Sequence, residues 1–554
     1  MKSSIFILLF TISCLATAQN YEEKFYLADS LVYAEADSIA NAKKGYQLYT
    51  ELYKEVPEKM TFWYLYDLAY AANKFNDLEK GFYWLEKTLA HYREDDVAFI
   101  IDKEAQKELY NLPKSPKWKD FQQKVQATIK SYIAEIKENQ QELIEKGLGG
   151  IDLEKLKSSN ALYQKIKSYR DYPKIPSEIF GFIKLNDTLE NNFFARVPSG
   201  YQPNQPAKVL FFLNGAVRYQ KIPSYPTTYM EEGWQRFYKK YAEEYNVIMV
   251  YPNCNKQFNW MLGDEGFAIV PKILQELKQF VNIDDHQVYV TGHSNGATGA
   301  FNYAMKNPNP FAAFYGMNTQ PKVYTGGTYL KNLSNRSFYN ISTDEDYYFP
   351  PKANDSLVVL AEELQLRFSD HRYQGFPHWF PQFDASEEAV KGIFENLIQQ
   401  KRNPFPAEIY WECDDVANGK VDWLAITELD TLQPKKDWHK EVNFTIHEWL
   451  SYNENDSLVS KRVNKKAFDF PRKSAAVKAS FENNRFNIQT SRVGKLSLYI
   501  SPEMIDMKRP IQIYVNGKQV YHQKANYERE FMIANLQKSY DRKALWIEEI
   551  NIEL

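Results

Sequence analysis

One glycine-flanked turn within residues 288–300 (VYVTGHSNGATGA) constrains the fold of this chain more than any other segment. An apolar, β-rich run leads into Gly292, Ser294 and Gly296, and small residues follow. This order predicts a buried strand, a tight turn and a helix that packs close to a sheet. Side chains two positions before and after the serine would collide in such a turn, so glycine is needed at both places. The hydroxyl of Ser294 is then exposed at the carboxyl end of the sheet; a purely structural turn is the alternative.

Predicted strands and helices alternate around this turn, from about residue 175 to residue 402. The strands lie in the segments 192–217, 246–254, 286–292 and 336–343, and the helices lie at 234–245, 270–281, 296–305, 355–366 and 386–399. Alternation of this kind predicts a mostly parallel sheet that is covered by helices on both faces, which is the α/β class.

The N-terminal segment has the features of a secretory signal peptide. Lys2 supplies a positive charge, residues 5–12 form a short apolar run, and Ala16-Thr17-Ala18 is a small-x-small cleavage site. The run is too short to span a bilayer. We expect residues 1–18 to be removed after Ala18 and the mature protein to be periplasmic or secreted. A lipid anchor on Cys14 is the less favoured alternative, and no transmembrane span is expected.

Two further domains are expected, because 554 residues are too many for one hydrophobic core. Residues 19–150 read as amphipathic helices, with a break at 74–77 and a last, long helix that ends at 147–150. Their spacing resembles a tetratricopeptide-like array, which implies a protein partner for these helices. A polar linker is expected from there to about residue 174.

Residues 403–554 change to short alternating strands, and Asn516-Gly517 is a strong signal for a two-residue hairpin turn. This pattern predicts an all-β sandwich. Three tryptophans could line a glycan-binding groove there or could fill the core: Trp411, Trp423 and Trp449. The core is the more common place for such residues.

A nucleophilic serine needs a base, and the base needs an acid that orients it. In a sheet of this kind they should follow the serine in the order acid, then histidine. The segment after the predicted strand 336–343 offers Asp344 and Asp346. His378 lies in a later loop, after another strand and before the last helix, so we expect it to be the general base.

The oxyanion of an acyl-transfer reaction needs two backbone N–H donors. We expect these from Asn295, which follows the nucleophile, and from Ala216, in a loop where Gly215 leaves room for the backbone to approach the substrate. Trp260 and Phe258 either wall the substrate site or pack at the sheet edge.

These motifs resemble the α/β-hydrolase esterases of the polyhydroxybutyrate depolymerase and feruloyl esterase type, over about residues 190–400. The matching segments are ARVPSGYQPNQPAKVLFFLNGA, VYPNCNKQFNW, NIDDHQVYVTGHSNGA and DEDYYFP. The resemblance favours Asp346 over Asp344 as the acid and implies that no cofactor is used. Where the family has His-Gly in the oxyanion loop, this chain has Asn214-Gly215.

The expected function is therefore a secreted serine esterase with Ser294, Asp346 and His378 as its triad. The expected substrates include acetyl or feruloyl esters on polysaccharides. A serine peptidase of the same fold, or a non-catalytic glycan- or protein-binding scaffold, are the alternatives. The net charge of −3 and the lack of a basic stripe disfavour nucleic acid as a partner. No metal-ligand motif occurs, and Cys254 and Cys413 are expected to be unpaired.

Overall fold

The computed structural model describes residues 21–34, 38–217, 223–232, 235–262, 265–470 and 472–554. The expected signal peptide at 1–18 lies outside these residues. The chain forms two compact units. The first comprises the described part of residues 1–138 together with 223–229, and the second comprises the described part of 139–222 and 230–554. The domain boundaries expected at 150, 175 and 403 remain predictions.

The first unit is helical. Its elements are a helix at 21–32, α2 (Ser38–Glu55), α3 (Phe62–Lys74), α4 (Leu78–Leu89), α5 (Lys103–Glu108) and the first part of α6 (Lys117–Lys146). The predicted break between α3 and α4 is present, and the Asp77 side chain caps α4 by accepting a hydrogen bond from the backbone N–H of Lys80. The tetratricopeptide-like character of this unit stays a prediction.

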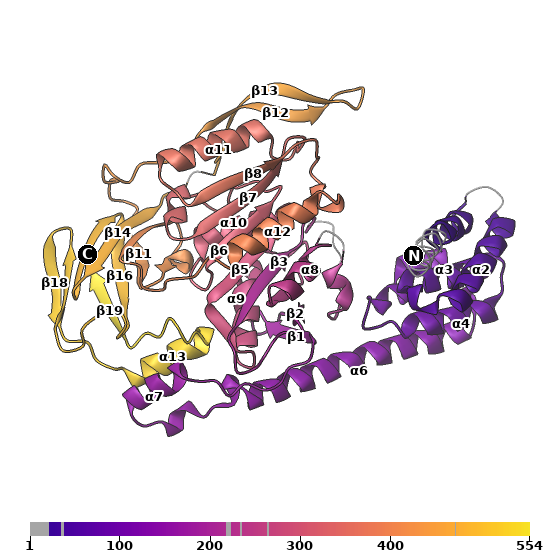
Figure 1. Ribbon diagram of the computed structural model, residues 1–554, viewed down its shortest axis with the longest axis horizontal. Helices are drawn as coiled ribbons and strands as arrows, with labels where there is room; N and C mark the ends of the chain where they lie inside the picture. The colour runs from indigo at the N-terminus through magenta and orange to yellow at the C-terminus, as the bar shows by residue number, and fades with distance from the viewer. Residues whose placement is uncertain (1–20, 35–37, 218–222, 233–234, 263–264, 471) are drawn as a thin grey trace, which may run out of the picture. The chain divides into compact units, whose positions relative to one another are not determined.

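An eight-stranded sheet forms the centre of the second unit (Figure 1), with the strand order β1-β2-β4-β3-β5-β6-β7-β8. The strands are β1 (Glu178–Lys184), β2 (Glu190–Arg196), β3 (Ala207–Leu213), β4 (Val247–Pro252), β5 (Ile283–Gly292), β6 (Ala313–Met317), β7 (Ser337–Thr343) and β8 (Phe368–Tyr373). All neighbours from β4 to β8 in this order pair in parallel, and β2 alone runs antiparallel to both of its neighbours, β1 and β4. The predicted α/β class is confirmed for this segment, although β1 and β6 had not been predicted.

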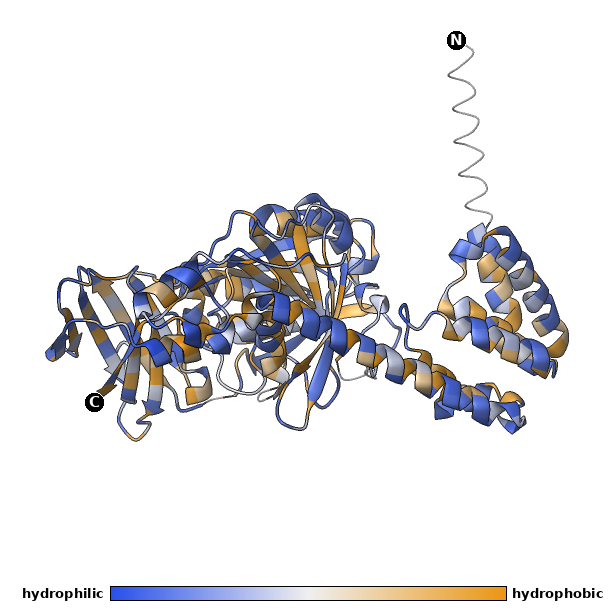
Figure 2. Cartoon of the chain, turned by 90° about the horizontal axis from the view of Figure 1, so that it is seen from below, coloured by the Kyte–Doolittle hydropathy of each residue, from blue (hydrophilic) through white to orange (hydrophobic). Residues whose placement is uncertain are grey.

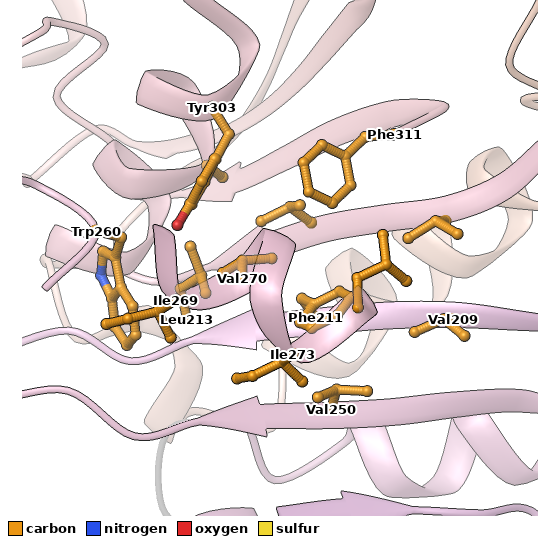
Figure 3. Packing of buried hydrophobic residues seen from close by; sticks show 14 of the residues in the cluster. Val209, Phe211, Leu213, Val250, Trp260, Ile269, Val270, Ile273, Tyr303 and Phe311 are labelled. Atoms are coloured by element: carbon orange, nitrogen blue, oxygen red, sulfur yellow. The ribbon is translucent and has the colours of Figure 1, made fainter. Parts of the chain in front are cut away.

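Two hydrophobic clusters cover the two faces of this sheet, because successive side chains of each strand point to opposite sides. Val209, Phe211 and Leu213 of β3 pack on one face with α9 (Glu265–Lys278) and α10 (Asn295–Lys306), as Figure 3 shows in part. Leu210 and Phe212 pack on the other face with α8 (Tyr238–Glu244) and α12 (Ser386–Leu397). The central strands are accordingly coloured as hydrophobic along most of their length in Figure 2.

The C-terminal part of this unit contains two more sheets, of order β10-β11-β16-β19 and β18-β17-β15-β14-β9. Their strands are β9 (Glu408–Cys413), β10 (Lys420–Val421), β11 (Leu424–Leu429), β14 (Ala475–Glu482), β15 (Arg485–Ser491), β16 (Val493–Ile500), β17 (Ile511–Val515), β18 (Lys518–Gln523) and β19 (Glu548–Glu553). Both sheets contribute to one hydrophobic core. The expected turn at Asn516-Gly517 joins β17 to β18, with positive φ at both residues.

This part differs from the expected all-β sandwich in two ways. It includes the helix α13 (Arg529–Ser539), and the helix α7 (Ser159–Lys167) of the expected linker packs into the same core. Trp411 and Trp423 are fully buried in that core. These two residues therefore fill the core, which is the place that the sequence favoured, and do not line a glycan groove.

A separate hairpin of β12 (Thr445–Tyr452) and β13 (Leu458–Lys466) leaves the C-terminal sheets and lies along α11 (Pro351–Glu363) (Figure 1). Trp449 of β12 takes part in this contact. Trp449 thus contacts Phe349, just before α11, and a buried cluster that includes Ala353 of α11.

A buried set of charged residues joins the C-terminal part to the large sheet. Arg402 binds both carboxylate oxygens of Asp541, at 2.7 and 3.0 Å. Lys278 lies 2.6 Å from Asp285 and 3.6 Å from Asp541. The backbone N–H of Arg542 donates to Asp285.

Across the described ranges, no helix combines the length and the apolar character needed to cross a bilayer.

Candidate active site

Ser294 occupies the sharp turn between β5 and α10. Its φ is 55° and its ψ is −121°, a conformation that is strained for any residue with a side chain. A Cβ on Gly296 would lie 1.7 Å from the carbonyl oxygen of Leu213, and a Cβ on Gly292 would lie 2.5 Å from the carbonyl carbon of Gly296. Glycine is thus required at both positions, as the motif predicted. The Ser294 side chain is partly exposed.

His378 lies in the loop between β8 and α12 and is the histidine that contacts the serine. Its Nε2 atom is 2.8 Å from the Oγ atom of Ser294. Its Nδ1 atom is 3.0 Å from each carboxylate oxygen of Asp346. The three side chains therefore form a continuous hydrogen-bonded series from a buried carboxylate to a partly exposed hydroxyl. Such a series can accept the serine proton and hold the resulting imidazolium.

Asp346 is fixed from several directions. It is 1% exposed. Its Oδ1 atom accepts a hydrogen bond of 2.8 Å from the backbone N–H of Tyr348, and its Oδ2 atom accepts one of 3.0 Å from Nδ2 of Asn318. Asp344, the alternative acid, instead accepts from the backbone N–H groups of Gly375 and Phe376 at 2.7 and 3.4 Å. Asp344 thus shapes the loop that carries His378, whereas Asp346 contacts its ring.

Asn318 is a site residue that the sequence analysis missed. It follows β6 directly and has a left-handed backbone with φ of 53°. Besides Asp346, its Nδ2 atom binds Oγ1 of Thr343 at 2.6 Å. The signal that could have found it is an asparagine at the carboxyl end of a strand beside the nucleophile strand. That strand, β6, has only five residues and was itself not predicted.

His293, the residue before the nucleophile, points away from Ser294 and toward the backbone of the histidine loop. Its side chain is buried, and its Nε2 atom is 2.8 Å from the carbonyl oxygen of His378. Burial lowers the pKa of His293 to about 3, and the neighbouring His378 adds to the effect. His293 is therefore neutral at ordinary pH, which leaves one ring N–H to donate to this carbonyl.

The loop after β3 approaches the nucleophile closely. A Cβ on Gly215 would lie 3.1 Å from the Cβ atom of Ser294, so the backbone of this loop runs beside the serine. Ala216 is exposed and has a positive φ of 53°. Asn295 is the first residue of α10, where the initial backbone N–H groups of a helix have no partner within the helix. The assignment of Ala216 and Asn295 as oxyanion donors stays a prediction.

Trp260 does not wall the site. It is 0% exposed and lies in the core between the sheet and α10, where a Cβ on Gly299 would be only 2.2 Å from its Cδ1 atom (Figure 3). The expected role in substrate contact is wrong for this residue, because the small residue on α10 lets the ring enter the core. Phe258 is half-buried against the same core, which favours the packing role that the sequence had left open.

Within the part of the chain that the structure describes, no three histidine, cysteine or carboxylate side chains gather so that they could hold a metal ion. Cys254 and Cys413 are free and buried, and burial raises the pKa of both thiols. Both cysteines are therefore poor nucleophiles.

Comparisons with known proteins find resemblance only among solved structures. No family model and no curated protein matches the chain. A thermostable esterase is 20% identical with a TM-score of 0.33, over 41% of this chain and 64% of that one. An S-formylglutathione hydrolase from Staphylococcus aureus is 13% identical with a TM-score of 0.31, over 40% of this chain and 100% of that one. A ferulic acid esterase is 13% identical with a TM-score of 0.32, over 40% of this chain and 98% of that one. At these values the likeness does not assign the chain to a family.

Proposed function

We propose that this chain is a serine hydrolase that cleaves carboxylic esters. The observation that carries the proposal is the hydrogen-bonded series Ser294–His378–Asp346, built on a strained turn whose two glycines cannot be replaced. A turn that only connected a strand to a helix would need neither the strained serine nor the oriented histidine. Strain of this kind persists only where the surrounding structure maintains it.

In the proposed reaction, the Oγ atom of Ser294 attacks the ester carbonyl while Nε2 of His378 takes the hydroxyl proton. Asp346 keeps Nδ1 of His378 protonated and stabilises the imidazolium. Backbone N–H groups of Asn295 and Ala216 are proposed to hold the oxyanion. The intermediate collapses, the proton passes to the leaving alcohol, and an acyl group remains on Ser294. Water, activated by His378, then releases the acid and restores the serine.

The proposed substrates are acetyl or feruloyl esters on polysaccharides, and the proposed location is the periplasm or the outside of the cell. The proposed location is supported by the leader expected at residues 1–18, with expected cleavage after Ala18. The substrate class follows from the sequence resemblance and is developed in the next subsection.

The proposal is tested with p-nitrophenyl acetate and a fluorophosphonate probe. The wild-type protein should hydrolyse the ester and be labelled on Ser294, and Ser294→Ala should lose both properties. Ser356→Ala, which removes a partly exposed hydroxyl on α11 that donates to the carbonyl oxygen of Lys352, is the matched control and should retain both. A folded wild type that is neither labelled nor active would refute the proposal and favour a binding scaffold. Faster cleavage of an acyl p-nitroanilide than of the ester would indicate a peptidase.

A further inference from the structure

Three tyrosine side chains form a continuous row that leads away from His378. We call Tyr348, Tyr347 and Tyr452 the tyrosine row. The ring of Tyr348 lies 4.2 Å from the ring of His378, centroid to centroid. Tyr347 lies 4.3 Å from Tyr348, and Tyr452 lies 5.3 Å from Tyr347. The row therefore begins at the proposed general base and ends on the hairpin β12–β13.

The hairpin is held against the acid loop by both apolar and ionic contacts. Trp449 of β12 packs against Phe349, with ring centroids 6.3 Å apart, and Ile446 belongs to the same buried cluster. Lys352 of α11 forms an ion pair of 2.5 Å with Glu448 of β12. These contacts fix the end of β12, where Tyr452 stands, beside the segment that follows Asp346. The hairpin comes from the C-terminal part of the chain but completes the surroundings of the site.

The row is open to solvent rather than part of a core. Tyr348 is 52% exposed, Tyr452 is 41% exposed, and Tyr347 between them is half-buried. Exposed aromatic rings that adjoin one another mark binding surfaces more often than isolated exposed rings do. A tyrosine offers an apolar face for stacking and a hydroxyl for hydrogen bonding.

The reaction geometry decides which half of the substrate meets this row. His378 delivers its proton to the leaving alcohol, so the alcohol oxygen has to come within hydrogen-bond distance of Nε2 of His378. Because Tyr348 packs against the ring of His378, it lies close to the position that the leaving alcohol has to reach. A small alkyl alcohol would reach Tyr348 at most, whereas a chain of sugar rings could extend along the row to Tyr452.

We propose that the tyrosine row is the subsite for the sugar rings of a polysaccharide whose hydroxyl carries the ester. This inference rests on the proposed esterase function. The weakly polar face of each pyranose ring stacks on a tyrosine ring, and the phenol hydroxyls bond to the ring hydroxyls. An aromatic acyl group would instead extend from the carbonyl carbon that is bonded to Ser294, whereas the row begins at the ring of His378.

The test compares glycan esters with an ester of a small alcohol. Substrates are acetylated xylo-, manno- and galacto-oligosaccharides, with methyl acetate as the reference that lacks a ring. The variants are Tyr452→Ala, Tyr452→Phe and, on the same hairpin, the exposed control Asn455→Ala. Tyr452→Ala should raise the KM for at least one glycan ester about tenfold more than it raises the KM for methyl acetate. The reason is that a sugar ring loses the aromatic ring on which it stacks. Tyr452→Phe should recover most of this loss, and Asn455→Ala should match the wild type.

The outcomes separate this inference from the esterase proposal. One outcome is that methyl acetate is hydrolysed and that Tyr452→Ala raises the KM for no glycan ester more than it raises the KM for methyl acetate. That outcome refutes the subsite and leaves the esterase proposal intact. If no ester is hydrolysed, the esterase proposal fails, and the row is tested by NMR titration with the same oligosaccharides. If the oligosaccharides bind Tyr452→Ala more weakly than they bind the wild type, a glycan site at the row is supported. If they bind both proteins equally, or if no binding is detected, the site is refuted.

Discussion

The side chain of His293 is hydrogen-bonded to the backbone carbonyl of His378, so the residue beside the proposed nucleophile holds the loop of the proposed base. The two imidazole rings lie 5.0 Å apart. Through this bond, the position of the base depends on the same turn that positions the nucleophile. Because His293 is bonded to the backbone of His378 rather than to its ring, we regard it as a positioning residue.

Replacing His293 should therefore slow the reaction without weakening substrate binding. His293→Ala leaves the carbonyl of His378 without this donor, and we expect kcat to fall about ten- to hundredfold with little change in KM, since a lost hydrogen bond of this kind costs about 1–3 kcal/mol. His293→Gln, which can still donate an N–H, should recover part of the loss. Steady-state kinetics with p-nitrophenyl acetate measure both effects. An unchanged kcat in His293→Ala would show that the bond does not position the base.

His293 should also make the fold less stable in acid. Its pKa is about 3 in the folded protein, against an ordinary value of 6.5. Between these two values the unfolded chain binds a proton that the folded protein excludes, so the free energy of unfolding falls as the pH decreases, by about 1.4 kcal/mol per pH unit from this group. Above pH 6.5 the group contributes no pH dependence.

Urea unfolding of the wild type and of His293→Gln between pH 7 and pH 4 measures this contribution. The two curves of unfolding free energy against pH should converge toward acid, because the variant lacks the buried imidazole. Parallel curves would mean that His293 is protonated within the folded protein, contrary to its burial.

The two candidate acids should differ sharply in their effect on turnover. Asp346→Asn removes the charge that holds the imidazolium and favours the wrong tautomer of His378, so kcat should fall about 10⁴-fold. Asp344→Asn keeps an oxygen that can accept from Gly375 and Phe376, and we expect kcat to stay within about tenfold of the wild type. Equal losses in the two variants would contradict the assignment of roles, and far-UV circular dichroism should confirm that both variants fold.

The turn at Ser294 should tolerate no added methyl group at Gly296. The new Cβ would meet the backbone of Leu213, which cannot move without distorting β3. We expect Gly296→Ala to lower the free energy of unfolding by about 3 kcal/mol and to abolish ester hydrolysis. Gly375→Ala is a useful contrast, because a Cβ there meets nothing within 4 Å, although its φ of +78° is strained for alanine. Similar activity in Gly296→Ala and in the wild type would contradict the close approach of the turn to β3.

The turn and its serine could be predicted because their determinants are local. Gly292 and Gly296 flank Ser294 within one short segment, and the steric reason for them needs no knowledge of the rest of the fold. His378 could be chosen from its place after a strand and before the last helix, since parallel strands bring their carboxyl ends to one edge. Asp344 and Asp346 could not be separated by this reasoning, because both follow the same strand. The choice between them came from the family resemblance.

The features that escaped prediction depend on residues far apart in the chain. Trp260 is buried because Gly299 of α10 leaves space for its ring. No sequence pattern near either residue predicts this contact. The hairpin β12–β13 falls in the segment expected to form a sandwich, yet it packs along α11, and Trp449 contacts Phe349 just before that helix. Asn318 was missed because β6 is too short to give a clear alternating pattern.

The buried charges between the large sheet and the C-terminal strands restrict how these two parts of the chain could have been joined or separated during evolution. Arg402 and Lys278 have almost no exposed side-chain surface, and both lie within ion-pair distance of Asp541. A chain that ended at residue 402 would leave the guanidinium of Arg402 without its carboxylate, and breaking a buried pair on one side costs about 3–5 kcal/mol. Gene fusion or loss at this boundary would have to change partners on both sides at once. The two parts are therefore expected to be inherited together and to fail as separately expressed pieces.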